Sequence, residues 1–171
     1  MNGAHRGAKQ RAEGTTKRAR AVEIAVSGVP LPRWRGRLKR FCAKALSGAG
    51  FMEWDISILL CDDGRIAELN GRYRGKNHPT DVLSFPLGER ESGSVGAAAL
   101  VVSGDIAISL DTLRRNAGEL GLPEDEELKR LLVHGLLHLA GMDHGRGTRK
   151  GMIALQEKLV SALGGERVIG E

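Results

Sequence analysis

The stretch HGLLHLAGMDHG, residues 134–145, holds three of the five histidines of this chain within eleven residues. Pro123 suits the first turn of a helix, which we expect to run to about Leu139. Gly141 follows and can end that helix in a left-handed turn. The sequence therefore predicts a cluster of histidines at the end of a helix.

The three histidines have the chemistry of a metal site. His134 and His138 are one helical turn apart and therefore lie on one side of the helix. Beyond the glycine turn, His144 can return to the same point. Three neutral imidazoles suit a zinc ion and leave a fourth position for water or substrate. We predict one Zn²⁺ held by His134, His138 and His144, with a chance cluster of surface histidines as the alternative.

The histidine spacing is also that of zinc peptidases with the pattern HExxHxxGxxH. In those enzymes the glutamate after the first histidine is the general base of peptide hydrolysis. Gly135 stands at that position here, and glycine has no group that accepts a proton. The sequence therefore indicates a zinc site without the peptidase base, which makes a peptidase the least favoured of the metallohydrolases.

Length and composition indicate one globular domain. With 171 residues, the chain can bury a core without disulfides. Cys42 and Cys61 are far apart, and we expect each to be a small buried apolar residue. No apolar run reaches the roughly 20 residues of a membrane helix, and no secretory signal is present. We expect a cytoplasmic protein with no membrane partner.

The positive charge is concentrated at the N-terminus. The net charge is +5, and residues 1–20 alone carry six basic residues against Glu13, so the remainder is neutral overall. This segment lacks the apolar residues that would offset the entropy of ordering it. We predict a disordered basic tail over residues 1–20, either a solvated leader or an arm that tethers RNA, followed by one domain over residues 21–171.

Hydrophobic periodicity predicts strands and helices in mixed order. The expected strands are residues 22–26, 54–61, 82–87 and 100–110. The expected helices are residues 31–49, a helix capped by Asp62 or Asp63 that passes through Asn70, a helix capped by Ser109 or Asp111 that ends near Gly121, the histidine helix, and residues 152–163. Such an order indicates an α+β domain with one mixed sheet of about four strands packed with helices.

The first predicted helix is unusually basic. Its apolar face is formed by Trp34, Leu38, Phe41 and Ala45. No acidic residue occurs between the start of this helix at residue 31 and Glu53. Such a basic surface usually faces solvent, although it can also contact phosphates. The basic residues distributed around it are Arg33, Arg35, Arg37, Lys39, Arg40 and Lys44.

Two further segments accompany the histidine motif: LNGRYRGKNHPTDVLSFP (Leu69–Pro86) and SGDIAIS (Ser103–Ser109). Together with HGLLHLAGMDH they resemble the YbeY family over residues 21–164. The resemblance implies a mixed sheet packed with helices, and zinc on the three histidines. It also implies a single-strand-specific, metal-dependent endoribonuclease that acts in 3′-end maturation of small-subunit (16S) rRNA and in ribosome quality control. Implied partners are the ribosome, a small-ribosomal-subunit protein and a ribosome-associated GTPase.

Arg74 matches the functionally important arginine of that family. An arginine before a Pro-Thr-Asp turn also suits bidentate capture of a phosphate, with a salt bridge or structural cap as the alternative. We expect Asp81 to buttress this turn rather than act as a base. His78 in the same loop and His5 in the tail have no assigned role.

This sequence departs from the family pattern at two places. Met142 replaces the usual aromatic residue before the Asp-His pair. After His144 the family is usually acidic, whereas this chain continues with a basic segment that can favour phosphate binding, GRGTRKG, residues 145–151.

Three hypotheses follow. The first is the zinc-dependent endoribonuclease, whose base can be metal hydroxide, the 2′-hydroxyl of the substrate or an unidentified residue. The second is a ribosome-associated binding factor with a mainly structural zinc. The third is a metallohydrolase of another substrate.

Overall fold

The computed structural model describes residues 20–87, 101–142 and 148–170. The strands are β1 (Arg20–Ser27), β2 (Glu53–Cys61), β3 (Val82–Pro86) and β4 (Val101–Ser109). The helices are α1 (Arg35–Gly48), α2 (Asp63–Arg74), α3 (Leu110–Leu120), α4 (Glu124–Leu139) and α5 (Thr148–Ala162). This arrangement confirms the predicted α+β domain with a mixed four-stranded sheet.

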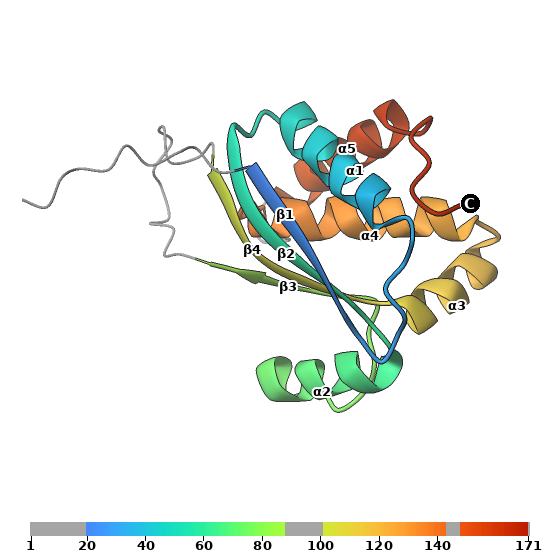
Figure 1. Cartoon of the computed structure of the whole chain (residues 1–171). Helices are drawn as coiled ribbons and strands as arrows, with labels where there is room; N and C mark the ends of the chain where they lie inside the picture. The colour runs from blue at the N-terminus through green and yellow to red at the C-terminus, as the bar shows by residue number, and fades with distance from the viewer. Residues whose placement is uncertain (1–19, 88–100, 143–147, 171) are drawn as a thin grey trace, which may run out of the picture.

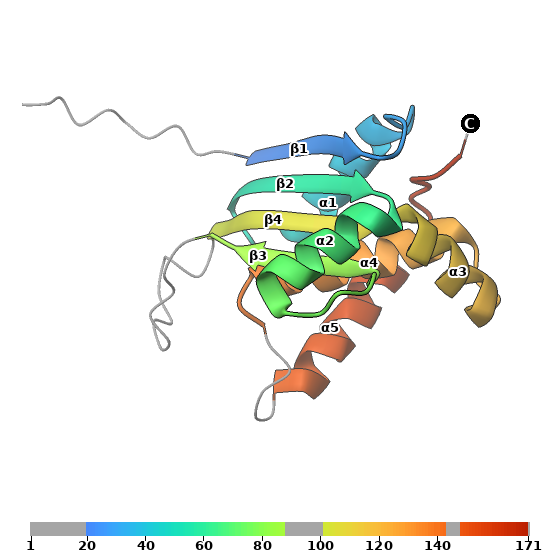
Figure 2. The same ribbon diagram turned by 90° about the horizontal axis from the view of Figure 1, so that it is seen from below.

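The strands form one sheet in the order β1-β2-β4-β3 (Figure 2). β1, β2 and β4 are parallel, with Ile24 opposite Ile58 and Ile58 opposite Ile106. β3 is antiparallel to β4, with Leu83 opposite Ala107. β1 and β3 are therefore the two edges of the sheet.

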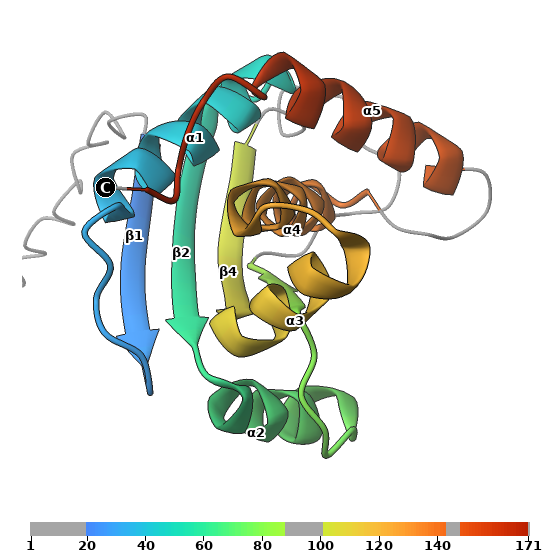
Figure 3. The ribbon, with the colours of Figure 1, turned by 90° about the vertical axis from the view of Figure 1, so that its right-hand side faces the viewer.

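Helices cover the two faces of the sheet unequally. α1 packs against β1, and α4 packs against β3 and β4 on the same face, with α5 outside α4 (Figures 1 and 3). α2 lies on the opposite face. The main core lies between the sheet and the helices α1, α4 and α5. Its largest fully buried side chains include Leu38, Phe41, Ile56, Ile58, Ile106 and Leu132.

A smaller apolar cluster lies under α2. It consists of Cys61, Ile66, Leu83 and Ala107. Both cysteines are buried and free, as predicted, and burial raises the pKa of the Cys42 thiol to about 12. Among the described residues, no helix is long and apolar enough to span a bilayer.

Local chemistry explains where most elements begin and end. The Asp62 carboxylate accepts a hydrogen bond from the Arg65 N–H at 2.8 Å and caps α2, and Ser109 caps α3 in the same way. The helix expected from residue 31 begins only at Arg35, because a residue that precedes proline, here Leu31, is disfavoured in the helical conformation.

Two other elements begin earlier than expected. α5 begins at Thr148, four residues before its expected start, and β1 begins at Arg20, opposite Trp54. The rest of the predicted tail, residues 1–19, lies outside the described residues.

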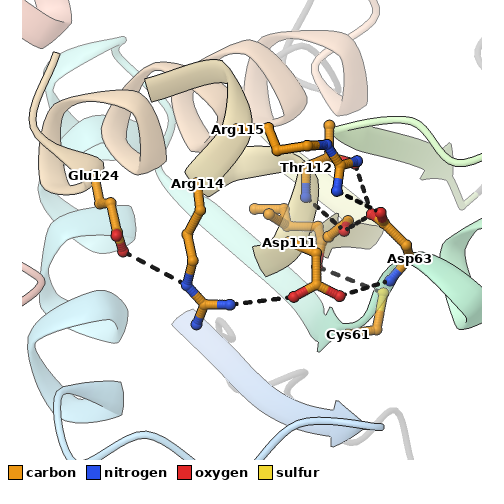
Figure 4. A network of polar contacts seen from close by, with 9 residues as sticks. Cys61, Asp63, Asp111, Thr112, Arg114, Arg115 and Glu124 are labelled. Carbon is orange, nitrogen blue, oxygen red and sulfur yellow. Dashed lines mark hydrogen bonds and ion pairs between the residues drawn. The ribbon is translucent and has the colours of Figure 1, made fainter. Parts of the chain in front are cut away.

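A polar network fastens the start of α2 to α3 (Figure 4). One oxygen of the Asp63 carboxylate accepts hydrogen bonds from the hydroxyls of Ser109 (2.6 Å) and Thr112 (2.7 Å). The other oxygen pairs with the Arg115 guanidinium at 2.7 Å. Arg115 and the two hydroxyls lower the pKa of Asp63 to about 2, against partial burial, which acts in the opposite direction.

We expect Asp63→Asn to lower stability at neutral pH and to have no such effect in acid. The pKa of Asp63 is depressed in the folded state, so its contribution is present above about pH 4 and is lost as the pH falls towards 2. Because the carboxylate is partly exposed, the effect at pH 7 should be about 1 kcal/mol. Melting temperatures measured across this range test the prediction. Asp55→Asn removes an exposed carboxylate on β2 outside this network and is the control. A pH-dependent loss no larger for Asp63→Asn than for Asp55→Asn would contradict the role of the network.

Candidate metal and phosphate site

His134 and His138 line a cavity of about 640 Å³ between the end of α4, β3 and the loop that follows α2. Its walls combine imidazoles with cationic side chains, and none of its described lining residues carries a carboxylate. The polar residues that line it are Asn70, Arg74, Lys76, His78, Thr80, Ser84, His134 and His138. The cavity is therefore suited to an anion.

His134 and His138 converge at this cavity. Their Nε2 atoms are 3.1 Å apart, and their rings meet edge to face at 78°. Two nitrogens bound to one tetrahedral zinc ion at its usual bond length are about 3.3–3.4 Å apart. The pair therefore matches two positions of such a site with little rearrangement. The third predicted ligand, His144, lies outside the described residues, and the part of the chain that is described contains no group of three ligating side chains.

The end of α4 is defined by a Schellman motif. Gly141 has a φ of 78°, and its N–H donates to the His138 carbonyl at 2.9 Å. The Met142 N–H donates to the Leu137 carbonyl at 3.0 Å. The glycine turn predicted from the sequence is confirmed, and it lies three residues after His138.

Gln156 on α5 is a contact that the sequence did not indicate. Its Oε1 atom lies 3.0 Å from Nδ1 of His134. A hydrogen bond from Nδ1–H to this oxygen places the lone pair of His134 on Nε2, the atom that faces His138. Gln156 is 22 residues from His134, and only the packing of α5 on α4 brings them together.

Arg74 is the last residue of α2, and Gly75 follows it with a φ of 68°. Its side chain is exposed at the rim of the cavity and makes no ion pair with any described residue. The structure therefore gives no support to the salt-bridge alternative. Lys76, two residues later, lines the same cavity and was not singled out from the sequence.

The loop between α2 and β3 is held by side-chain hydrogen bonds. The Asn70 amide donates to the His78 carbonyl at 2.9 Å, which folds the loop back on α2. The Asp81 carboxylate accepts from the Val82 N–H at 2.8 Å and from the Thr80 hydroxyl at 3.2 Å. Asp81 thus buttresses the turn, as predicted. His78, which had no predicted role, lies exposed at the cavity.

Gly135 allows α4 to approach the sheet. A Cβ atom at this position would lie 3.0 Å from Cδ1 of Ile106 and 3.2 Å from Oγ of Ser84. These distances are shorter than ordinary van der Waals contacts, so a larger side chain would push the helix away. The absence of glutamate at this position is therefore explained by packing as well as by chemistry.

We expect Gly135→Glu to destabilise the fold by roughly 2–4 kcal/mol, because the carboxylate would be forced between α4 and the sheet. No peptide hydrolysis should appear. Gly118→Glu is the matched control, since Gly118 is exposed on α3 with open space around its Cβ position. Thermal unfolding and hydrolysis of casein test both variants. Peptidase activity in Gly135→Glu, or equal stability of the two variants, would contradict this account.

The sequence of this chain is similar to one protein family and to individual members of it. The family model described as "Endoribonuclease YbeY" matches residues 24–164. The Endoribonuclease YbeY of Treponema denticola is 45% identical over 125 residues, which cover 72% of this chain and 80% of that protein. The protein of the same name from Treponema pallidum is 38% identical over 141 residues, covering 82% and 88%.

The fold also has a counterpart among solved structures. A solution structure of a Thermotoga maritima protein superimposes with a TM-score of 0.55 at 28% sequence identity, covering 85% of this chain and 91% of that one. The family match includes Arg74 and the converging histidines His134 and His138. The chain therefore belongs to the endoribonuclease YbeY family.

Proposed function

We propose that this protein is a zinc-dependent, single-strand-specific endoribonuclease that acts in the cytoplasm on the 3′ end of small-subunit (16S) rRNA and in ribosome quality control. The observation that carries the proposal is the convergence of His134 and His138 beside an exposed arginine in one cavity whose described lining residues carry no carboxylate. The names of the relatives support a nuclease that acts on RNA.

The residues at the cavity fit a zinc ion. His134 and His138 would hold it, and His144, in the segment between Met142 and α5, is the proposed third ligand. When bound, zinc supplies a Lewis acid for the phosphodiester and a source of hydroxide at neutral pH. Neutral imidazole is the ligand form required, and the hydrogen bond from His134 to Gln156 favours the tautomer with a free Nε2 lone pair.

The cationic rim would bind and orient the phosphodiester. The guanidinium of Arg74 can donate two parallel hydrogen bonds to phosphate oxygens, and Lys76 adds a second positive charge. Arg74 is the last residue of α2, and the left-handed Gly75 directly after it closes the helix through backbone hydrogen bonds to Asn70 and Gly71. As charge develops on the phosphoryl oxygens, these donors would stabilise the transition state.

We expect Arg74→Ala to keep the zinc and the fold but to lower kcat for single-stranded RNA by about 10²- to 10³-fold. Arg72→Ala is the matched control, because Arg72 lies on the same helix with its guanidinium 5.4 Å from the centre of the Tyr73 ring. Cleavage of a labelled single-stranded RNA, with zinc content measured on the same samples, is the test. Wild-type activity in Arg74→Ala would remove the arginine from the mechanism.

His134→Ala separates the proposed enzyme from a binding factor with a structural zinc. We expect this variant to lose both zinc and cleavage. A zinc-loaded wild-type protein that binds ribosomal subunits but cleaves no RNA would favour the binding factor.

We also expect Gln156→Leu to weaken zinc binding by about 10- to 100-fold, because the residue that orients a ligating histidine is lost. Gln156→Glu keeps the acceptor and should retain zinc affinity. Competition with a chromophoric chelator measures both variants, and melting of the zinc-free proteins controls for folding. Equal zinc affinity in Gln156→Leu and the wild-type protein would show that Gln156 only packs α5 against α4.

A further inference from the structure

The start of α1 carries an unusual concentration of unneutralised positive charge. Several exposed arginines elsewhere in the described parts of the chain are paired with carboxylates: Arg65 with Glu68, Arg114 with Asp111, Arg115 with Asp63, and Arg130 with Glu127. In contrast, the exposed guanidiniums of Arg33, Arg35 and Arg40 make no hydrogen bond or ion pair with the described residues.

Two of these arginines, with Arg37, surround an open hollow of about 900 Å³. The residues that line it are Arg33, Trp34, Gly36, Arg37, Arg40, Ile169 and Gly170. We refer to these residues as the α1 patch. A Cβ atom at Gly36 would lie 3.8 Å from Nη1 of Arg40, so the Arg40 side chain extends back along the helix across this glycine. The lack of a side chain at Gly36 keeps the hollow open.

The C-terminal segment fixes the centre of the patch. The Arg37 guanidinium donates to the Val168 carbonyl at 2.9 Å and to the Gly170 carbonyl. The Val168 and Ile169 N–H groups in turn donate to the Asp125 carboxylate at 2.8 and 2.6 Å. These contacts order the wall formed by residues 168–170, and they leave Arg33 and Arg40 exposed on either side of Arg37.

The patch is distinct from the histidine cavity. α1 packs against β1, whereas the cavity is lined by β3, and these strands are the opposite edges of the sheet (Figure 2). With strands about 4.8 Å apart, the width of the sheet alone separates the two edges by about 14 Å. A single residue of a polymer cannot span this distance, but an RNA strand of several nucleotides can.

We propose that the α1 patch binds the phosphate backbone of single-stranded RNA outside the cleavage cavity. The inference rests on the proposed function, because it assigns the patch to the same substrate. Guanidiniums recognise phosphate through paired N–H donors, and the half-buried Trp34 beside them offers an aromatic surface for a base. The hollow is lined by three arginines and by no carboxylate of the described residues, which favours a polyanion, and the aromatic ring of Trp34 favours a nucleic acid over an acidic protein.

Salt-dependent binding of a labelled 2′-O-methyl oligouridylate to the zinc-loaded protein tests the proposal. Arg33→Gln combined with Arg40→Gln should raise Kd about ten-fold at low salt. It should also lower the slope of log K against log salt by about 1.4, which corresponds to two phosphate contacts with a single strand. The control, Arg114→Gln with Arg130→Gln, removes the same net charge from arginines that are paired with acids, and it should bind like the wild-type protein.

Trp34 provides a direct reporter. Trp54 is the only other tryptophan and is 3% exposed, with its indole N–H unpartnered among the described residues, so Trp54→Phe should be tolerated. In this background, RNA should change the emission of Trp34, and the Arg33 and Arg40 substitutions should abolish the change at the same RNA concentration.

The possible failures are distinguishable. Unchanged affinity and salt slope in the patch variant, with RNA binding and cleavage intact in the wild-type protein, would overturn the α1 patch and leave the proposed function standing. A wild-type protein that neither binds nor cleaves RNA would overturn the proposed function itself. Equal loss of binding in the patch and control variants would show that RNA binding depends only on the net charge of the protein, which would also overturn the α1 patch. Tighter binding of polyglutamate than of RNA would assign the patch to an acidic protein.

Discussion

The close approach of α4 to the sheet at Gly135 is the contact on which the candidate site depends. Ile106 and Ser84 lie where a Cβ atom would otherwise project, so the helix axis rests near β3 and β4. This proximity places the two histidines, on either side of Gly135 in sequence, against the strand that forms the opposite wall of the cavity. A side chain at residue 135 would widen the cavity and separate the imidazoles from the cationic rim. The close packing of α4 on the sheet therefore favours glycine at position 135, and the proposed metal chemistry does not require a glutamate there.

The second organising feature is the way in which α2 is held at both ends. Its first turn is tied to α3 by the Asp63 network, and its last turn is tied to the following loop by Asn70. Between them, Ile66 contributes to the small cluster under the helix. Arg74 is therefore presented by a helix that is anchored before and behind it, although α2 contributes little to the main core. The contacts at the two ends of α2 hold the backbone near Arg74 in place, while the guanidinium of Arg74 extends into solvent.

Much of this architecture was readable from the sequence, and the reasons are local. Alternating or continuous apolar runs gave the four strands, while Asp62, Ser109, Gly121 and Gly141 marked helix ends through capping chemistry that involves only near neighbours. The early start expected for α1 was wrong, because the effect of Pro32 on the residue before it outweighs apolar periodicity.

Tertiary relationships could not be predicted in the same way. The strand order, the antiparallel direction of β3 and the contact between Gln156 and His134 depend on packing between distant segments. No sequence motif marks Lys76 as a site residue. Only the fold of its loop shows that Lys76 lines the same cavity as the histidines. The position of His144 relative to them remains a prediction.

The place of β3 at the edge of the sheet has a consequence for association between chains. Edge strands present unpaired backbone groups that can recruit a strand from another molecule and begin aggregation. Here the edge strand β3 is also a wall of the histidine cavity. β3 is only five residues long and ends in Pro86, which has no N–H to donate. A short, proline-terminated strand is a poor template for such pairing, so the chain can keep this edge open at low risk of self-association.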